Sequence, residues 1–177
     1  MEAEILSLSS KKEMRAFSLR RLTQKDIPAA LALQKEALAL IPSRALFEPL
    51  TEEELLESAE VDSVFGLFDG DTLAAFSMII HNRETDRSLA PDAEKACGET
   101  FTFDGVLVRP AFRGFGIQRL FLSLAEKEAK KHGAACILAT TAPPNLHSRK
   151  NFESMGFSIV KEYIKYGYPR LLLKKEL

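Results

Sequence analysis

From residue 17 onward, strand-like segments alternate with segments whose apolar residues recur every three or four positions. The strand-like segments are 17–22, 64–68, 73–80, 101–108, 135–140, 157–163 and 170–174. Helical spacing covers 27–41, a short acidic stretch after 51, 117–131 and the residues from about 145. This pattern predicts a mixed α/β fold in a single domain over residues 17–177. Residues 1–16 are polar and predict a loose tail.

Capping and turn residues sharpen several of these boundaries. Thr23 and Asp26 have the spacing of a helix start, and Thr51 and Glu54 repeat it before the acidic stretch. Asp69-Gly70-Asp71 separates two apolar runs and predicts an antiparallel hairpin. Residues 81–97 are charged and irregular, which is typical of a binding loop and of a disordered segment alike.

Composition excludes several classes of protein. The 24 basic side chains nearly balance the 25 acidic ones, so the chain lacks the positive field that sequence-independent nucleic-acid binding needs. Its longest apolar run, 73–80, is far shorter than a membrane span, and the N-terminus lacks the pattern of a secretion signal. The two cysteines, Cys97 and Cys136, predict neither a disulfide framework nor a zinc site. We therefore expect a cytoplasmic protein with no metal, no membrane partner and no nucleic-acid partner.

The segment Arg113-Gly-Phe-Gly-Ile-Gln118 joins the predicted strand 101–108 to the helix 117–131. The first turn of a helix presents free backbone N–H groups, and glycine lets an anion approach them closely. Gly114 and Gly116, flanked by Arg113 and Arg119, therefore predict a phosphate or pyrophosphate site on the amides of residues 113–119. The alternative is an ordinary left-handed turn. A Walker loop would need Gly-Lys-Ser/Thr here, and a dinucleotide fingerprint would need a third glycine in a parallel βαβ unit.

Two blocks of sequence resemble the GNAT superfamily of N-acetyltransferases. The segment from Val106 to Leu120 is similar to the strand-loop-helix signature Gln/Arg-x-x-Gly-x-Gly/Ala, which binds the pyrophosphate of acetyl-coenzyme A (acetyl-CoA). A second block matches the spacing of the family's Asn-x-x-Ala-x-x-x-Tyr-x-x-x-Gly-Phe helix; the residues at those positions are Asn145, Ser148, Phe152, Gly156 and Phe157. The resemblance runs from about Phe17 to the C-terminus. It implies a mostly antiparallel central sheet with a splayed central strand pair, and acetyl-CoA as cosubstrate without a metal.

The resemblance also implies a mechanism and a set of cofactor-binding residues. The strand end Val106, Leu107 and Val108 would separate from 135–140, accept the pantetheine arm and offer an N–H to the acetyl carbonyl. Asn145 would hold the arm from the other side. A primary amine would attack the thioester directly in a ternary complex. The pyrophosphate would bind at Arg113, Gly114, Phe115, Gly116, Ile117, Gln118 and Arg119.

Three positions depart from the family pattern. Gln118 replaces the last Gly or Ala of the signature, and we expect pyrophosphate binding to survive because a backbone amide serves equally in any residue. Phe152 occupies the position where many relatives carry a tyrosine that protonates the leaving thiolate. Thr140 occupies the position where some relatives carry a glutamate base. Both usual positions for proton transfer therefore lack the group that performs it.

Asp104 is our candidate base, because it shares the strand parity of Val106 and Val108, and Tyr163 is our candidate acid. The ordinary interpretation of either residue is a solvated side chain or a position at the edge of the core. The same holds for the other substitutes considered, which are Glu99, His147, Tyr166 and Tyr168.

The resulting hypothesis is an acetyl-CoA-dependent N-acetyltransferase acting on a small-molecule or peptide amine. We expect the acceptor pocket to involve residues 27–60 and the loop 81–99, and the sequence leaves a homodimer open. One alternative is a non-catalytic sensor or regulatory module that binds CoA. Another is a nucleotide-binding protein without acetyl chemistry.

Overall fold

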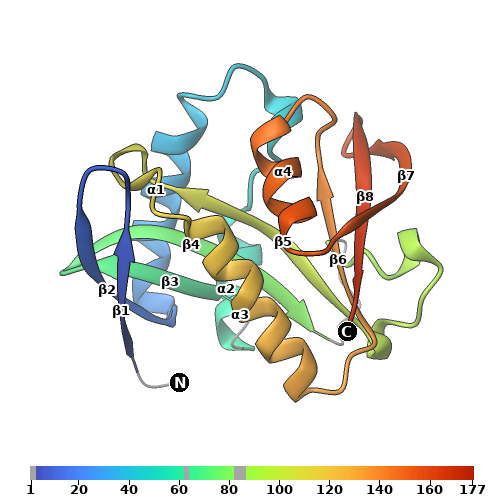
Figure 1. Ribbon diagram of the computed structural model, residues 1–177, viewed down its shortest axis with the longest axis horizontal. Coiled ribbons are helices and arrows are strands. Elements are labelled where there is room, and N and C mark those ends of the chain that lie inside the picture. The colour runs from blue at the N-terminus through green and yellow to red at the C-terminus, as the bar shows by residue number, and fades with distance from the viewer. Residues whose placement is uncertain (1–2, 62–63, 82–86) are drawn as a thin grey trace. The chain divides into compact units, whose positions relative to one another are not determined.

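The computed structural model describes residues 3–61, 64–81 and 87–177 (Figure 1). Its helices are α1 (Ile27–Leu38), α2 (Glu52–Glu60), α3 (Ile117–Lys131) and α4 (Leu146–Ser154). Its strands are β1 (Glu4–Ser9), β2 (Met14–Arg21), β3 (Val64–Asp69), β4 (Thr72–His81), β5 (Thr100–Val108), β6 (Cys136–Thr141), β7 (Ser158–Lys165) and β8 (Tyr168–Glu176). The strands form one sheet in the order β1-β2-β3-β4-β5-β6-β8-β7. The predicted mixed α/β class is confirmed.

The strands pair mostly in antiparallel fashion, as expected from the family resemblance. β5 and β6 run parallel, whereas β1–β2, β2–β3, β3–β4, β6–β8 and β7–β8 run antiparallel. By its internal contacts the chain divides into two compact units. The first comprises residues 1–42, 49–78 and 106–117, and the second 43–48, 79–105 and 118–177. The prediction of a single domain over 17–177 stays a prediction.

The polar start of the chain differs from the prediction of a loose tail over residues 1–16. β1 lies inside that range and pairs with β2 from Glu4–Leu19 to Ser9–Met14. Within β1, the half-buried Leu6 and Leu8 alternate with exposed neighbours, which is the two-residue period of a strand with one covered face. This pattern is short and lies among serines, so composition hides it.

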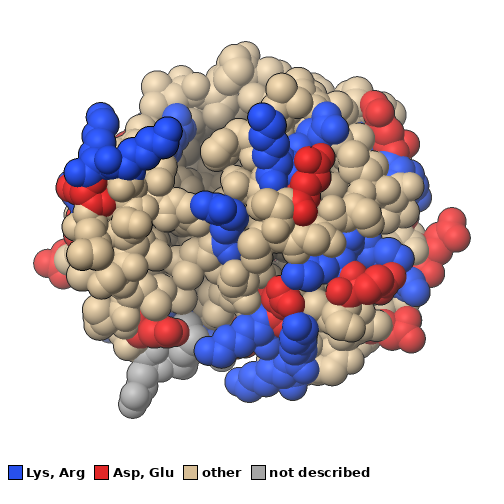
Figure 2. Space-filling view, viewed as in Figure 1, with Lys and Arg blue, Asp and Glu red and all other residues tan. Residues whose placement is uncertain are grey.

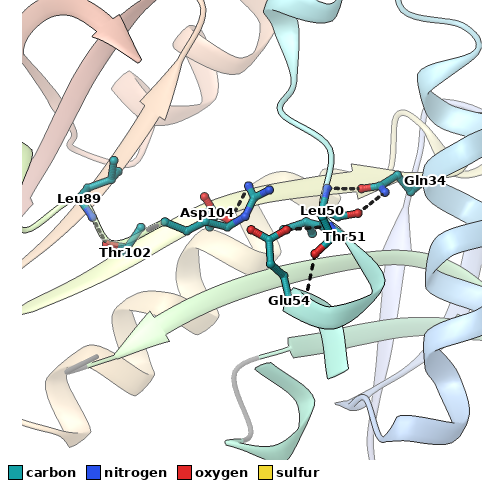
Figure 3. A network of polar contacts seen from close by, with 8 residues as sticks. Gln34, Leu50, Thr51, Glu54, Leu89, Thr102 and Asp104 are labelled. Carbon is teal, nitrogen blue, oxygen red and sulfur yellow. Dashed lines mark hydrogen bonds and ion pairs between the residues drawn. The ribbon is translucent and has the colours of Figure 1, made fainter. Parts of the chain in front are cut away.

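In the first unit, the predicted capping box at Thr51 and Glu54 begins α2, whereas that at Thr23 and Asp26 begins a 3-10 turn that leads into α1. Thr51 Oγ1 accepts a hydrogen bond from Glu54 N at 3.1 Å, and Glu54 Oε2 accepts one from Thr51 N at 2.7 Å, which forms a capping box before α2 (Figure 3). Just before it, the buried Gln34 of α1 bonds both backbone groups of Leu50, at 2.8 Å and 2.9 Å. The chain entering α2 is therefore fixed against α1. β3 and β4 form the predicted hairpin around Gly70, whose φ is +57°.

In the second unit, both the end of α3 and the C-terminal hairpin follow the sequence pattern. α3 ends in Lys130 and Lys131, and Gly133 follows with φ +71°, as expected of a helix C-terminal cap. The β7–β8 hairpin pairs residue 165 with 168, so Tyr166 and Gly167 form its two-residue turn, at φ +56° and +78°. Two positive φ values are typical of a type I′ turn, but tyrosine is an unusual residue for it.

The distribution of charge and the hydropathy of the helices are two further properties of the structure. Figure 2 shows lysine and arginine side chains interspersed with aspartate and glutamate over the face in view, in keeping with a formal net charge of −1. Among the described residues, none of the helices is both long and apolar enough to cross a membrane.

Candidate active site

The loop between β5 and α3 is held by its one large apolar residue. After a short 3-10 turn over Pro110–Phe112, the backbone passes through Gly114 at φ +93° and Gly116 at φ +71°. Between the glycines, Phe115 is 5% exposed and packs edge-to-face on Phe17, with ring centroids 5.4 Å apart. The buried ring anchors the loop in the first unit, while the glycines turn the backbone into α3.

This loop leaves consecutive backbone amides without partners. The structure gives the N–H groups of Gly114, Phe115 and Gly116 no hydrogen bond to any described residue. Ile117 begins α3, whose first-turn amides have no intrahelical partner by geometry. A Cβ added at Gly114 would meet no atom within 4 Å, so the space beside this backbone is open. The loop therefore fits an anion such as the pyrophosphate of acetyl-CoA.

The charged side chains next to the loop suit the same ligand. Arg113 and Arg119 are exposed, and neither forms an ion pair with any of the residues described. Gln118 points its amide group elsewhere: Nε2 donates to Ser148 Oγ at 2.9 Å, and Oε1 accepts from Asn151 Nδ2 at 2.8 Å. Both partners lie at or in α4, so this departure from the family pattern joins α3 to α4 and leaves the loop amides clear.

β5 and β6 pair over only part of their length. Their parallel register runs from Thr100–Cys136 to Phe103–Ala139. β5 continues to Val108, and the last residues of β6, Thr140 and Thr141, pair with β8. The end of the register agrees with the predicted splay of the central strand pair.

Asn145 occupies the N-cap of α4, where its Oδ1 accepts a hydrogen bond from Ser148 N at 3.2 Å. Its Nδ2 group makes no hydrogen bond to a described residue. The cap fixes the side chain and leaves one donor for a ligand, as the predicted contact with the cofactor arm requires.

Phe152 is part of the core of the second unit. It is 2% exposed and packs edge-on against Phe103 and Phe157, with centroid distances of 6.0 Å and 5.2 Å. Thr140 has a polar partner instead of a carboxylate: its Oγ1 accepts a hydrogen bond from Arg170 Nε at 3.2 Å. The position where some relatives carry a base therefore faces a cation here.

The candidate base lies in a buried ion pair. Asp104 Oδ2 is 3.3 Å from Arg87 Nη1, and the two side chains are 4% and 9% exposed. Nearby, Thr102 Oγ1 accepts a hydrogen bond from Leu89 N at 3.0 Å, which fixes the segment that carries Arg87 against β5 (Figure 3). Asp104 must share or break its contact with Arg87 in order to take a proton.

The hydroxyl oxygen of the candidate acid is also buried, although the Tyr163 side chain as a whole is only partly buried. The Tyr163 hydroxyl makes no hydrogen bond of standard geometry with a described residue. Burial, reinforced by the Asp92 carboxylate, raises the pKa of Tyr163 well above its usual value, although the neighbouring Thr140 hydroxyl opposes the shift. Tyr163 is therefore protonated at neutral pH, and its hydroxyl has a proton to donate.

Sequence reasoning missed three residues of this region, Arg87, Tyr166 and Arg170. Arg87 and Arg170 are both buried, and the Tyr166 hydroxyl is buried without a hydrogen-bond partner among the described residues. One signal was available for Arg170, since it directly precedes the apolar run 171–173. A charged side chain next to a buried strand is costly unless it is paired or hydrogen-bonded. Nothing in the spacing of the other two distinguishes them. Among the described residues, no three His, Cys, Asp or Glu side chains form a metal-binding group.

Comparison with known proteins places the chain in a family. Residues 30–157 match the model of the acetyltransferase (GNAT) family. The chain belongs to this family of acyltransferases, and the resemblance found in the sequence is confirmed. No curated protein matches the chain.

Solved structures share the fold. A putative acetyltransferase from Salmonella typhimurium, solved with its cofactor acetyl-CoA, superimposes with a TM-score of 0.68 at 18% identity, over 90% of this chain and 93% of that one. The ribosomal-protein-S18-alanine N-acetyltransferase from Escherichia coli gives 0.67 at 18% identity, with coverage of 90% and 93%. A GNAT-family acetyltransferase from Listeria monocytogenes gives 0.71 at 16% identity, with coverage of 97% and 100%.

Proposed function

We propose that this protein transfers an acetyl group from acetyl-CoA to a primary amine in a ternary complex. The observation that carries the proposal is the run of amides at Gly114, Phe115 and Gly116, directly before α3, to which no described residue offers a hydrogen bond. Family membership supplies the chemistry that such an anion site serves.

In this proposal the backbone from residue 113 to 119 holds the pyrophosphate, with the Arg113 and Arg119 side chains adding charge. The strand end Val106–Val108 and the Nδ2 group of Asn145 hold the pantetheine arm. A backbone N–H of Val106–Val108 donates to the acetyl oxygen and stabilises the charge that develops there. The described residues thus act mainly by binding and orienting two reactants.

The transfer forms one C–N bond and breaks one C–S bond. The amine nitrogen attacks the thioester carbon, the amine gives up a proton, and the CoA thiolate leaves and takes up a proton. Asp104 is our candidate for receiving the first proton, and Tyr163 for donating the second. If Asp104 is the base, Asp104→Asn removes the acidic limb of the pH–rate profile, and an unchanged profile would exclude this role.

The proposed activity is tested by thiol release from acetyl-CoA with a panel of primary amines. A thiol-reactive dye follows the release, and mass spectrometry identifies the acetylated amine. We expect amine-dependent release, with a reaction lacking amine as the control. The cytoplasmic location and a homodimer stay predictions.

A second candidate, a CoA-binding sensor, is favoured by one observation: Thr140 and Phe152 carry no acid or base at the family's usual positions. Tight CoA binding with no amine-dependent thiol release across the panel would support the sensor over the enzyme.

A further inference from the structure

A polar cluster lies where the parallel register of β5 and β6 ends. The last paired residues are Phe103 and Ala139, and the next residue of each strand, Asp104 or Thr140, contacts an arginine. Arg87 lies 3.3 Å from Asp104, and Arg170 donates to Thr140 at 3.2 Å. All of these residues belong to the second unit.

Arg170 is a buried cation without a carboxylate partner. Its side chain donates through Nε to Thr140 Oγ1 and through Nη1 to the Ala45 carbonyl at 2.9 Å. No carboxylate of a described residue lies at ion-pair distance from it, while Asp104 and Glu48 act on it from farther away. Burial lowers the pKa of Arg170, as expected when a charge loses water without gaining an ion pair. A charge buried in this way is costly unless an anion completes it.

Two tyrosine hydroxyls in the same region are also incomplete. Tyr163 and Tyr166 each bury the hydroxyl oxygen without a hydrogen-bond partner among the described residues. Both lie near Arg170 and are among the groups that oppose the effect of burial on its pKa. The guanidinium carbon of Arg87 also lies 5.9 Å from the centroid of the Tyr166 ring. Buried polar groups normally find partners, so three incomplete ones in one region indicate a ligand.

The positive φ of Tyr166 strengthens this indication. A non-glycine residue in the left-handed region is strained, and such strain is found most often at functional sites. The turn of the β7–β8 hairpin would form more easily with asparagine at this position. The strained conformation therefore occurs at a residue whose hydroxyl has no hydrogen-bond partner in the described part of the chain.

We propose that Arg170 and Tyr166 bind the carboxylate of the acceptor, so that the amine substrate is an amino acid or a similar amino carboxylate. Guanidinium N–H groups and phenol O–H groups are donors, and a carboxylate offers two oxygens that accept from both. Asp104 balances the charge of Arg87, whereas Arg170 has no ion-pair partner among the described residues, so the anionic end of the substrate faces Arg170 and the amine lies toward Asp104. The inference rests on the proposed acetyl transfer.

Matched pairs of substrates test this inference. Each pair consists of an amino carboxylate and its carboxamide, with α-, β- and γ-amino acids to vary the distance between the two groups. Short peptides with an acidic first or second residue separate a free amino acid from a peptide source. A neighbouring carboxylate raises the basicity of the amine, so at pH 8 the carboxamide is intrinsically the more reactive member. A higher kcat/KM for the carboxylate member therefore reports recognition by the protein.

Tyr166→Phe removes only a hydroxyl, and that hydroxyl has no hydrogen-bond partner among the residues that the structure describes, so the fold should be unaffected. We expect KM for the carboxylate substrate to rise about tenfold, the usual effect of losing one hydrogen bond to a charged group. KM for acetyl-CoA should not change, and the preference over the carboxamide should fall. Tyr168→Phe is the matched control, because Tyr168 lies in the same hairpin and is 36% exposed. Arg170 is a poorer target for substitution, because it also donates a hydrogen bond to the Ala45 carbonyl. Tyr163 is a poorer target as well, because it is the candidate acid and its loss would change the chemistry.

Calorimetric titration of the same pairs, with CoA present, decides the inference without turnover. Tighter binding of a carboxylate member, weakened by Tyr166→Phe and unchanged by Tyr168→Phe, would support it even if no acetyl transfer occurred. Equal or tighter binding of the carboxamide in every pair, or no binding of any carboxylate, would overturn it. Acetyl transfer to unsubstituted amines without a carboxylate preference would overturn the inference and leave the proposed function standing.

Discussion

Replacing Gly114 by glutamate adds a carboxylate to the loop proposed to hold the pyrophosphate. The new side chain has room, because nothing lies within 4 Å of the position its Cβ would take. The cost to the fold comes from φ +93° and amounts to about 1–2 kcal/mol. Gly114→Gln has almost the same shape and the same strain, so a comparison of the two variants isolates the charge.

The charge effect follows from Coulomb's law. At ~6 Å and an effective dielectric constant of ~40, two unit charges repel by about 1.4 kcal/mol. A pyrophosphate with about two nearby charges doubles this energy, which weakens binding about 100-fold, since each 1.4 kcal/mol is a factor of ten. Salt screens an exposed pair, so the effect should decrease markedly between about 0.1 M and 1 M salt.

Calorimetric titration of CoA into both variants measures the difference. Gly70→Glu is the control, because Gly70 also has a positive φ of +57° and open space at its Cβ, but lies in the β3–β4 turn. We expect that control to bind CoA within about twofold of the parent chain. If Gly114→Glu and Gly114→Gln bind CoA equally well at low salt, the pyrophosphate does not bind at this loop.

Three further predictions concern stability and reactivity. Gln118→Ala removes two hydrogen bonds and should lower the free energy of unfolding by about 1–2 kcal/mol in urea titrations. The pKa of Asp26 is lowered mainly by Arg20, so the stability gained from their pair is fully present above the unfolded pKa of about 4 and is lost as the pH falls through the lower folded-state pKa. Asp26→Asn should therefore cost about 1 kcal/mol at pH 7, and this cost should decrease progressively as the pH falls below about 4 in the same titrations. Burial raises the pKa of the Cys136 thiol, so mass spectrometry of its peptide should show alkylation at pH 8 only after unfolding.

Local signals made most of the fold predictable. The Thr51–Glu54 box, the turn at Gly70 and the cap at Gly133 each act within a few residues, so their sequence patterns state the geometry directly. The β1–β2 hairpin escaped prediction because only Leu6 and Leu8 mark its covered face. Two half-buried leucines are too weak a period to distinguish a strand from a polar tail.

The candidate site divides in the same way. The glycine loop is contiguous, so its residues could be named from the sequence. The contacts of Asp104 with Arg87 and of Thr140 with Arg170 join residues 17 and 30 positions apart. Such contacts depend on strand register and on the path of a long loop, and neither is encoded in local spacing. Asp104 and Thr140 could be singled out from the sequence, but their contacts with the two arginines could not.

The contacts of Gln118 have a consequence for local opening of the molecule. Proteins open in cooperative segments, and a segment opens as one when its parts share bonds. Gln118 links the first turn of α3 to Ser148 and Asn151, and α4 begins at the cap formed by Asn145. Fraying of α4 would break the capping bond that fixes the Asn145 side chain, and it would loosen the first turn of α3 in the same event. Hydrogen exchange in these two segments should therefore rise together, and CoA should slow it in both.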